Sequence, residues 1–146
     1  MEVKAKVIPG YGAASGRNND ERYSKGTIST QSEHFRQRGL DLSSYFMGTL
    51  NVDISPYTYS IKTPKFFFKN INWSKYISPE NFYFFDIELI FGDKSYFGLV
   101  YMPDPATKQE HKQLATTLEL ILPKIENLEY GAEVYLRLED SQLKMM

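Results

Sequence analysis

The sequence predicts an all-β, β-dominated fold: a single closed β-barrel with one or two short helices. Aromatic residues make up 15% of the 146 residues, and they gather in runs typical of strands. Alternating apolar segments are numerous, whereas segments with helical periodicity are few. Closing the sheet on itself also removes the unpaired strand edges that so aromatic a chain would otherwise leave open.

Eight segments have the pattern of strands. In the first, Val3, Ala5 and Val7 alternate with lysines, which predicts one buried and one exposed face. The aromatic runs 66–68 and 82–85 place rings on both faces of their strands. One set of rings is expected to fill the core, and the other to pack under a loop or a helix. The expected strands cover residues 3–8, 48–54, 57–62, 66–71, 82–91, 95–102, 117–122 and 132–138.

Helical signals are confined to three places. Residues 30–33, TQSE, have the spacing of a capping box, and Gly39 can end a helix in the left-handed conformation. A short helix is therefore expected at about 31–38. A second helix is possible at 108–115, and residues 124–130 are expected to form a helical turn.

The length of the chain suits one domain with a sizeable core. The barrel domain is expected to cover residues 1–138, and residues 139–146 are polar enough to be a C-terminal tail that frays. The net charge of −1 provides no basic field, so nucleic acid is not an expected partner.

Cysteine usage and hydropathy restrict the compartment and the kind of metal site. The chain has no cysteine and two histidines, which excludes disulfides and thiolate sites and makes a histidine zinc site unexpected. This composition is compatible with a reducing cytoplasm. The segment MEVKAK lacks an apolar signal core, and no apolar run approaches the roughly 20 residues that span a bilayer. No membrane association is expected.

Residues 48–54, GTLNVDI, open a strand with polar groups where a ligand could use them. The apolar residues alternate with Asn51 and Asp53, so these two polar side chains share a face. Gly48 lets the backbone approach another group closely, and Thr49 and Asn51 offer short oxygen ligands. Such a set would suit a phosphate-bound metal ion. The alternative is a half-buried strand in which a neighbouring loop satisfies Asn51.

A loop rich in small residues follows the first strand. Residues 8–16 read IPGYGAASG, and such a loop can let backbone N–H groups converge on an anion. It lacks the lysine and hydroxyl ending of a P-loop, and a helix does not follow it directly, so neither that motif nor the dinucleotide fingerprint fits. The alternative is an ordinary surface loop. The candidate phosphate-binding residues are Gly10, Gly12, Ser15, Gly16, Arg22 and Lys25.

The order of these elements resembles that of the archaeal-type CTP-dependent riboflavin kinases. A first strand, a glycine-rich loop and a short helix ending in Gly39 precede GTLNV at 48–52. The likeness continues in FGDKSYFG at 91–98 and ends with TLELILP at 117–123 and GAEV at 131–134. GTLNV is the most specific match, and the resemblance spans nearly the whole chain.

The resemblance implies a closed six-stranded cradle-loop barrel that transfers a phosphoryl group from a nucleoside triphosphate, CTP in that family, to riboflavin, giving FMN. The glycine-rich loop and Gly48 would hold the nucleotide. Thr49 and Asn51 would help to hold Mg²⁺, and Glu119, which matches the closing-strand glutamate of the family, would be the catalytic base. The expected partners are a nucleoside triphosphate and riboflavin or FMN, with no nucleic acid and no membrane. The protein is expected to be a cytoplasmic monomer or a weak homo-oligomer.

Departures from the family leave a second function open. The polar stretch 18–25 is inserted after the loop, and Met47 stands where a proline commonly precedes GTLN. A non-catalytic relative would use the same site to bind a nucleotide, a flavin or a partner protein. For Glu119 the alternative is a solvated strand glutamate. Asp53 is an alternative base or metal partner, and His111 has the surroundings of a surface histidine.

Overall fold

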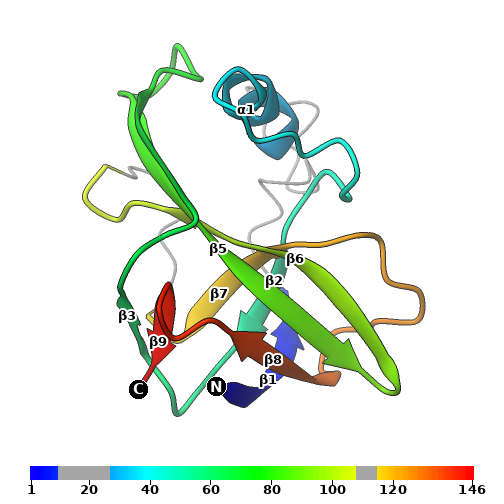
Figure 1. Ribbon diagram of the computed structural model, residues 1–146. Helices are drawn as coiled ribbons and strands as arrows, with labels where there is room; N and C mark the ends of the chain where they lie inside the picture. Colours follow the sequence, from blue (N-terminus) through cyan, green and yellow to red (C-terminus); the bar gives the residue numbers. More distant parts are fainter. Residues whose placement is uncertain (10–26, 108–114) are drawn as a thin grey trace.

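The computed structural model describes residues 1–9, 27–107 and 115–146, and in these ranges it contains one helix and nine strands (Figure 1). The β-dominated fold is confirmed, and so are the eight predicted strands, each within two residues at either end. The elements are β1 (Glu2–Ile8), α1 (Thr27–Arg36), β2 (Leu50–Asp53), β3 (Tyr59–Ile61), β4 (Phe66–Ile71), β5 (Glu80–Phe91), β6 (Lys94–Pro103), β7 (Thr117–Ile121), β8 (Glu133–Leu138) and β9 (Leu143–Met145). In the described part of the chain, no helix has the length and apolar character needed to cross a bilayer.

Seven strands form one antiparallel sheet in the order β4-β5-β6-β7-β2-β1-β8. β8 also pairs with β5, so the pairings run in a ring through β5, β6, β7, β2, β1 and β8. The short strands β3 and β9 pair with each other in a separate sheet. Figure 1 shows both ends of the chain on the same side of the molecule, away from α1.

β5 changes its neighbour along its length. Phe84 is the register partner of Phe66 in β4, whereas from Ile87 onwards β5 pairs with β8. β6 stays beside β5 from end to end. The first half of β5 therefore extends beyond the ring, together with β4 and the end of β6, and we call this extension the arm (Figure 1).

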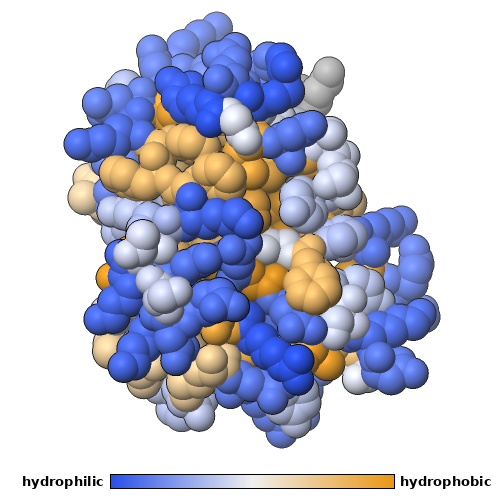
Figure 2. All heavy atoms as spheres, in the orientation of Figure 1, coloured by the Kyte–Doolittle hydropathy of each residue, from blue (hydrophilic) through white to orange (hydrophobic). Residues whose placement is uncertain are grey.

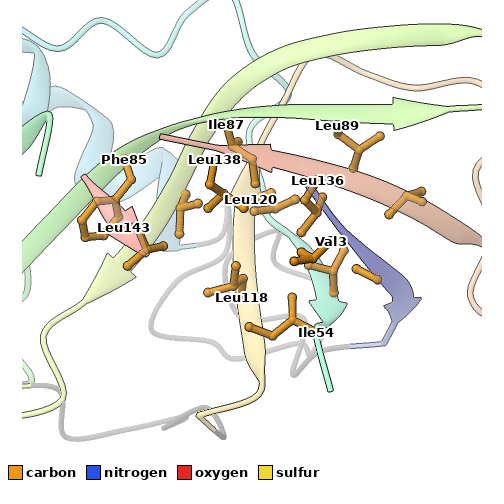
Figure 3. Close-up of a cluster of buried hydrophobic side chains, with 14 of the residues drawn as sticks. Val3, Ile54, Phe85, Ile87, Leu89, Leu118, Leu120, Leu136, Leu138 and Leu143 are labelled. Atoms are coloured by element: carbon orange, nitrogen blue, oxygen red, sulfur yellow. The ribbon is translucent and has the colours of Figure 1, made fainter. Parts of the chain in front are cut away.

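The ring encloses the first of two hydrophobic clusters, the inner cluster. Val3, Ala5 and Val7 belong to it, as their alternation predicts. Figure 3 shows its side chains pointing toward one another from β1, β5, β7, β8 and β9. Burying each valine, leucine or isoleucine side chain of this cluster stabilises the fold by about 1.5–3 kcal/mol. The residues labelled in Figure 3 are Val3, Ile54, Phe85, Ile87, Leu89, Leu118, Leu120, Leu136, Leu138 and Leu143.

α1 covers the opposite face of the sheet, over the second cluster, which we call the outer cluster. Its buried residues Ile28, Gln31 and Phe35 are three and four positions apart, so they share one face of the helix. The ring of Phe35 packs edge-on against Phe82 and Phe84, with 5.1 Å between ring centroids in both pairs. Figure 2 shows a band of hydrophobic residues at the surface, below the hydrophilic top of this view.

The aromatic runs divide between the two faces, which confirms the expected core packing. Phe82 and Phe84 lie in the outer cluster under α1, and Phe85 lies in the inner cluster. On the arm, Phe67 is exposed and stacks on Tyr83 with 4.6 Å between ring centroids. The run 82–85 therefore contributes to both clusters, whereas the run 66–68 contributes Phe66 and Phe68 to the outer cluster alone.

The predicted start of the helix is wrong. α1 already includes Thr27, so Thr30 and Glu33 lie inside the helix and do not form a capping box. Glu33 instead accepts a hydrogen bond from Arg36, whose Nε lies 3.0 Å from Glu33 Oε2. The spacing of a capping box also occurs within helices, and here the apolar side chain of Ile28 brings the preceding turn onto the sheet.

The predicted end of the helix is confirmed. Gly39 has a φ of 97°, the left-handed conformation. Leu40 N donates to Phe35 O at 3.0 Å, and Gly39 N donates to Arg36 O at 3.1 Å. This pair of bonds is a Schellman motif, which satisfies carbonyl groups at the end of α1.

The other two helical predictions fare differently. Residues 124–130 contain no helical turn; Asn127 has a φ of 63°, and Ala132 N donates to Glu129 O at 3.1 Å in a tight turn. The prediction of a helical turn is wrong because Asn127, within the segment, has a positive φ. Gly131, which directly follows the segment, has a positive φ as well. The possible helix at 108–115 lies outside the described residues except for Ala115, which is in a turn.

The expectation of a fraying tail at 139–146 is also wrong. β9 pairs with β3, and Leu143 and Met145 are 0% and 2% exposed within the inner cluster. The two residues alternate with polar neighbours, so the segment has the pattern of a strand. Three residues are too few for that pattern to be evident in the sequence alone.

Leu143→Ala is therefore expected to lower the free energy of unfolding by about 2–5 kcal/mol, because it leaves a cavity in the inner cluster. Urea unfolding followed by circular dichroism measures this loss. The neighbouring Lys144 is exposed, and Lys144→Ala is the matched control, with an expected change within about 0.5 kcal/mol. Equal, small losses in the two variants would show that β9 frays in solution.

Where β5 changes its neighbour from β4 to β8, the side chain of Gln142 forms the hydrogen bonds that a neighbouring strand would otherwise make. Asp86 N donates to Gln142 Oε1 at 2.8 Å, and Gln142 Nε2 donates to Asp86 Oδ2 at 2.9 Å. Lys65 Nζ lies 2.9 Å from Asp86 Oδ1. The amide of Gln142 thus occupies the place of a peptide group between the end of the β4 pairing and the start of the β8 pairing.

Candidate functional site

Side chains on the outer face of the sheet line up across six strands. Because register partners point to the same face, they form a continuous row. The row changes from aromatic side chains at the arm to polar side chains on β7 and β2, and it ends at β1. Its members, from β4 to β1, are Phe66, Phe84, Tyr101, Glu119, Asn51 and Ile8.

Glu119 lies at the middle of β7. Its neighbours Leu118 and Leu120 belong to the inner cluster, and Glu119 points to the other face, as predicted. The residue is 9% exposed. Glu119 is therefore a buried carboxylate and not the solvated strand glutamate of the alternative interpretation.

The structure brings Thr49, Asn51 and Glu119 together. Thr49 Oγ1 donates to Glu119 Oε1 at 3.1 Å. Asn51 is the register partner of Glu119 on the adjacent strand, a relation that places Cβ atoms about 4.5–5.5 Å apart. Three oxygen-bearing side chains, from β7 and from β2 with the residue before it, thus meet on one face of the sheet.

A tight turn delivers Thr49 to this position. Phe46 N donates to Leu122 O at 3.0 Å, which ties the turn to the residue after β7. Gly48 is buried, and its N–H donates to Phe46 O at 3.0 Å. The N–H group of Gly48 is thus used within the turn, and a phosphate contact at Gly48 stays a prediction.

Tyr101 of β6 is the register partner of Glu119 and was not among the residues predicted for the site. Tyr101 Oη donates to Gln31 Oε1 of α1 at 2.6 Å. Burial raises the pKa of Tyr101 well above its usual value, and the nearby carboxylates of Glu119 and Glu80 raise it further. The phenol therefore stays protonated and remains a hydrogen-bond donor.

Glu80 is a second buried carboxylate on this face. It accepts a hydrogen bond from Trp73 Nε1 at 2.8 Å. Glu80 begins β5 and lies two and four positions before Phe82 and Phe84, so the three side chains share a face. The place of Glu80 on the outer face could therefore have been inferred from the sequence. Gln31 could have been found in the same way, since it lies three residues after Ile28 on the helix.

Asp53, the alternative base, is not close to Glu119 in the register. It is the register partner of Lys6 and Thr117. Its Oδ1 accepts hydrogen bonds from Ser55 N at 2.9 Å and Ser55 Oγ at 2.7 Å. These bonds lower the pKa of Asp53, with a smaller contribution from Lys6. Asp53 therefore stabilises the turn after β2.

The remaining predicted residues lie outside the described ranges. Residues 10–26 and 108–114 are not described, so their predicted roles stay predictions. They comprise the candidate phosphate-binding residues Gly10, Gly12, Ser15, Gly16, Arg22 and Lys25, together with His111.

The chemistry of the donor set can be compared with the needs of Mg²⁺. In residues 1–9, 27–107 and 115–146, no three His, Cys, Asp or Glu side chains gather as a metal cage. Thr49, Asn51 and Glu119 instead supply a hydroxyl, an amide and a carboxylate oxygen, and Mg²⁺ prefers oxygen ligands. Mg²⁺ commonly keeps several waters and uses one or two protein ligands plus substrate phosphates. The donor set fits a magnesium ion that arrives on a nucleotide.

Comparison with known proteins adds no assignment: no family model matches the chain, and no curated protein matches it.

Proposed function

We propose that the protein is a phosphotransferase that moves the terminal phosphoryl group of a nucleoside triphosphate, CTP by resemblance, to the ribityl hydroxyl of riboflavin, giving FMN. The observation that carries the proposal is the meeting of Thr49, Asn51 and Glu119. The resemblance to riboflavin kinases assigns functional roles to these three residues. A hydrogen bond from Thr49 to Glu119 and the register pairing of Asn51 with Glu119 bring the three side chains together.

The strand pairings support the proposed closed barrel of the riboflavin-kinase type. Such a barrel needs six strands in a circle, and the pairings run through β5, β6, β7, β2, β1 and β8 in that manner. We further propose that the protein acts in the cytoplasm, as a monomer or a weak homo-oligomer.

In the proposed reaction, Glu119 takes the proton from the substrate hydroxyl. The hydroxyl oxygen then forms a bond to the terminal phosphorus, and the bond from that phosphorus to the leaving nucleoside diphosphate breaks. Thr49 orients the Glu119 carboxylate through the bond between Thr49 Oγ1 and Glu119 Oε1. Mg²⁺, when bound, neutralises the charge that develops on the transferred group, and Thr49 and Asn51 would hold it.

The direct test is to incubate the purified protein with Mg²⁺, riboflavin and each nucleoside triphosphate in turn, and to look for FMN by chromatography. FMN formation with one of the nucleotides is the expected result. A lack of FMN with every nucleotide would contradict the proposal.

Asn51→Leu is expected to weaken Mg²⁺-dependent nucleotide binding by about tenfold or more, because it removes an oxygen ligand without changing the backbone of β2. Calorimetric titration of CTP and ATP, with and without Mg²⁺, measures the change. Asp53→Leu on the same face of β2 is the matched control and should leave the affinity unchanged. Equal affinity in the parent and Asn51→Leu would remove Asn51 from the site.

A non-catalytic binding module is the second candidate, and two observations favour it. The N–H of Gly48 is used by Phe46 O, and Met47, which replaces the common proline, packs against the outer cluster. A protein that binds nucleotide in calorimetry but forms no FMN would match this second function.

A further inference from the structure

Gln31 is the polar member of the buried face of α1. Its apolar neighbours on this face, Ile28 and Phe35, are fully buried, and Gln31 itself is 2% exposed. Burying an amide is unfavourable unless its polar atoms are hydrogen-bonded. An apolar side chain would pack at this position without that cost, so the glutamine has to be explained by what it contacts.

Gln31 contacts Tyr101, which is equally remote from solvent. The 2.6 Å bond from Tyr101 Oη to Gln31 Oε1 joins residues 70 positions apart. The bond lies within the hydrophobic outer cluster. There a hydrogen bond is stronger than in water, and a change of geometry leaves a polar group unpaired. The bond therefore favours one placement of α1 over the sheet.

Tyr101 connects this placement to Glu119. On one side Tyr101 is the register partner of Glu119, and on the other it is the partner of Phe84, against which Phe35 of α1 packs. The ring of Tyr101 thus stands between the aromatic contact of α1 and the Glu119 carboxylate. A shift of the helix or of this ring changes the space available to Glu119.

We propose that Gln31 and Tyr101 are positioning residues for Glu119, and that their hydrogen bond sets the geometry in which Glu119 meets its substrate. The inference rests on the proposed function, in which Glu119 takes the substrate proton. Neither residue touches the reacting atoms. Their effect is therefore on turnover through geometry and not on nucleotide affinity.

Tyr101→Phe tests this role, because it removes the hydroxyl and keeps the ring. The kcat for FMN formation should fall by about tenfold or more, while the KM for nucleotide stays within about twofold. Gln31→Leu should give the same loss, and the double variant should lose no more than either single one, since both remove one bond.

Ile121→Val is the matched control. Ile121 lies in the outer cluster, so its loss of one methylene group lowers stability without touching the bond between Gln31 and Tyr101. Its kcat should stay within about twofold of the parent. The inference is overturned if Tyr101→Phe keeps its kcat, or if Ile121→Val loses as much.

A second measurement separates this inference from the proposed function. If the parent forms no FMN with any nucleotide, the proposed function fails, and hydrogen exchange then decides the role of the bond. Residues 27–36 should exchange about tenfold faster in Tyr101→Phe than in Ile121→Val, because the bond joins α1 to β6. Residues 117–120 should show the same difference, because Tyr101 is the register partner of Glu119. Equal exchange in the two variants would overturn the inference.

Discussion

Glu119→Gln is expected to reduce the rate of FMN formation by about 10²- to 10⁴-fold, the range ordinarily supplied by a general base. The amide oxygen of glutamine can still accept the hydrogen bond that Thr49 Oγ1 donates to Glu119 Oε1 at 3.1 Å. The fold should therefore be preserved while the proton acceptor is lost. The measurement is the rate of FMN formation at saturating riboflavin and nucleotide, together with the thermal transition.

The control for this variant is Glu133→Gln. Glu133 is an exposed glutamate on β8 that pairs with Lys4 at 3.3 Å. Its replacement removes the same charge at a surface ion pair, which contributes about 0–1 kcal/mol to stability. FMN formation in Glu133→Gln should match the parent. If Glu119→Gln kept more than about a tenth of the parent rate, Glu119 would not be the general base.

Gly98→Ala is expected to have a large effect on stability. A Cβ atom at Gly98 would lie 2.1 Å from the backbone oxygen of Ile121 and 2.9 Å from Cδ2 of Leu122. Overpacking of a core typically costs about 1–3 kcal/mol. Here the obstacle is a backbone carbonyl that cannot rotate away, so we expect a loss of at least about 3 kcal/mol, or a fall in Tm of roughly 6–12 °C.

Gly92→Ala is the matched control, because it changes the same residue type in the same hairpin. Gly92 turns the chain between β5 and β6 with a φ of 64°, and no atom lies within 4 Å of an added Cβ. Only the left-handed backbone is strained there, at a cost of about 1–2 kcal/mol. Differential scanning calorimetry compares the two variants. Equal Tm values would show that β6 and β7 can separate locally to admit the methyl group of Gly98→Ala.

Local patterns predicted the strands, because these segments either alternate between apolar and polar residues or form continuous apolar and aromatic runs. Val3, Ala5 and Val7 alternate along β1, and the hairpin between β5 and β6 has Gly92 at its turn. The end of α1 was also predictable, since glycine readily adopts the left-handed conformation that ends a helix, as Gly39 does here. These features depend on residues that are neighbours in the sequence.

The features that were missed depend on distant partners. β9 is a strand because β3 pairs with it and because Leu143 and Met145 reach the inner cluster, and neither condition can be inferred from three residues. The pairing of β5 with β8 likewise requires the ring to be assembled first.

The candidate site was predictable in part, for the same physical reason. Alternation places Asn51 and Glu119 on the face of the sheet away from the apolar side chains of their own strands. The direction of both side chains could therefore be predicted. The hydrogen bond between Gln31 and Tyr101 spans 70 positions and joins a helix to a strand. Such a contact depends on how α1 is seated on the sheet, which local periodicity does not determine.

The two hydrophobic clusters share their walls, and this has a consequence for ligand screening. Phe85 of β5 and Leu120 of β7 belong to the inner cluster, while their neighbours Phe84 and Ile121 belong to the outer one. If either cluster unfolds, the strands that also carry the side chains of the other cluster lose their packing on one face. The ring and the arm should therefore unfold in one transition. A small molecule that binds beside Glu119 would then raise the melting temperature of the whole chain by mass action. A thermal-shift screen of nucleotides and flavins can therefore identify the ligand without any assumption about turnover.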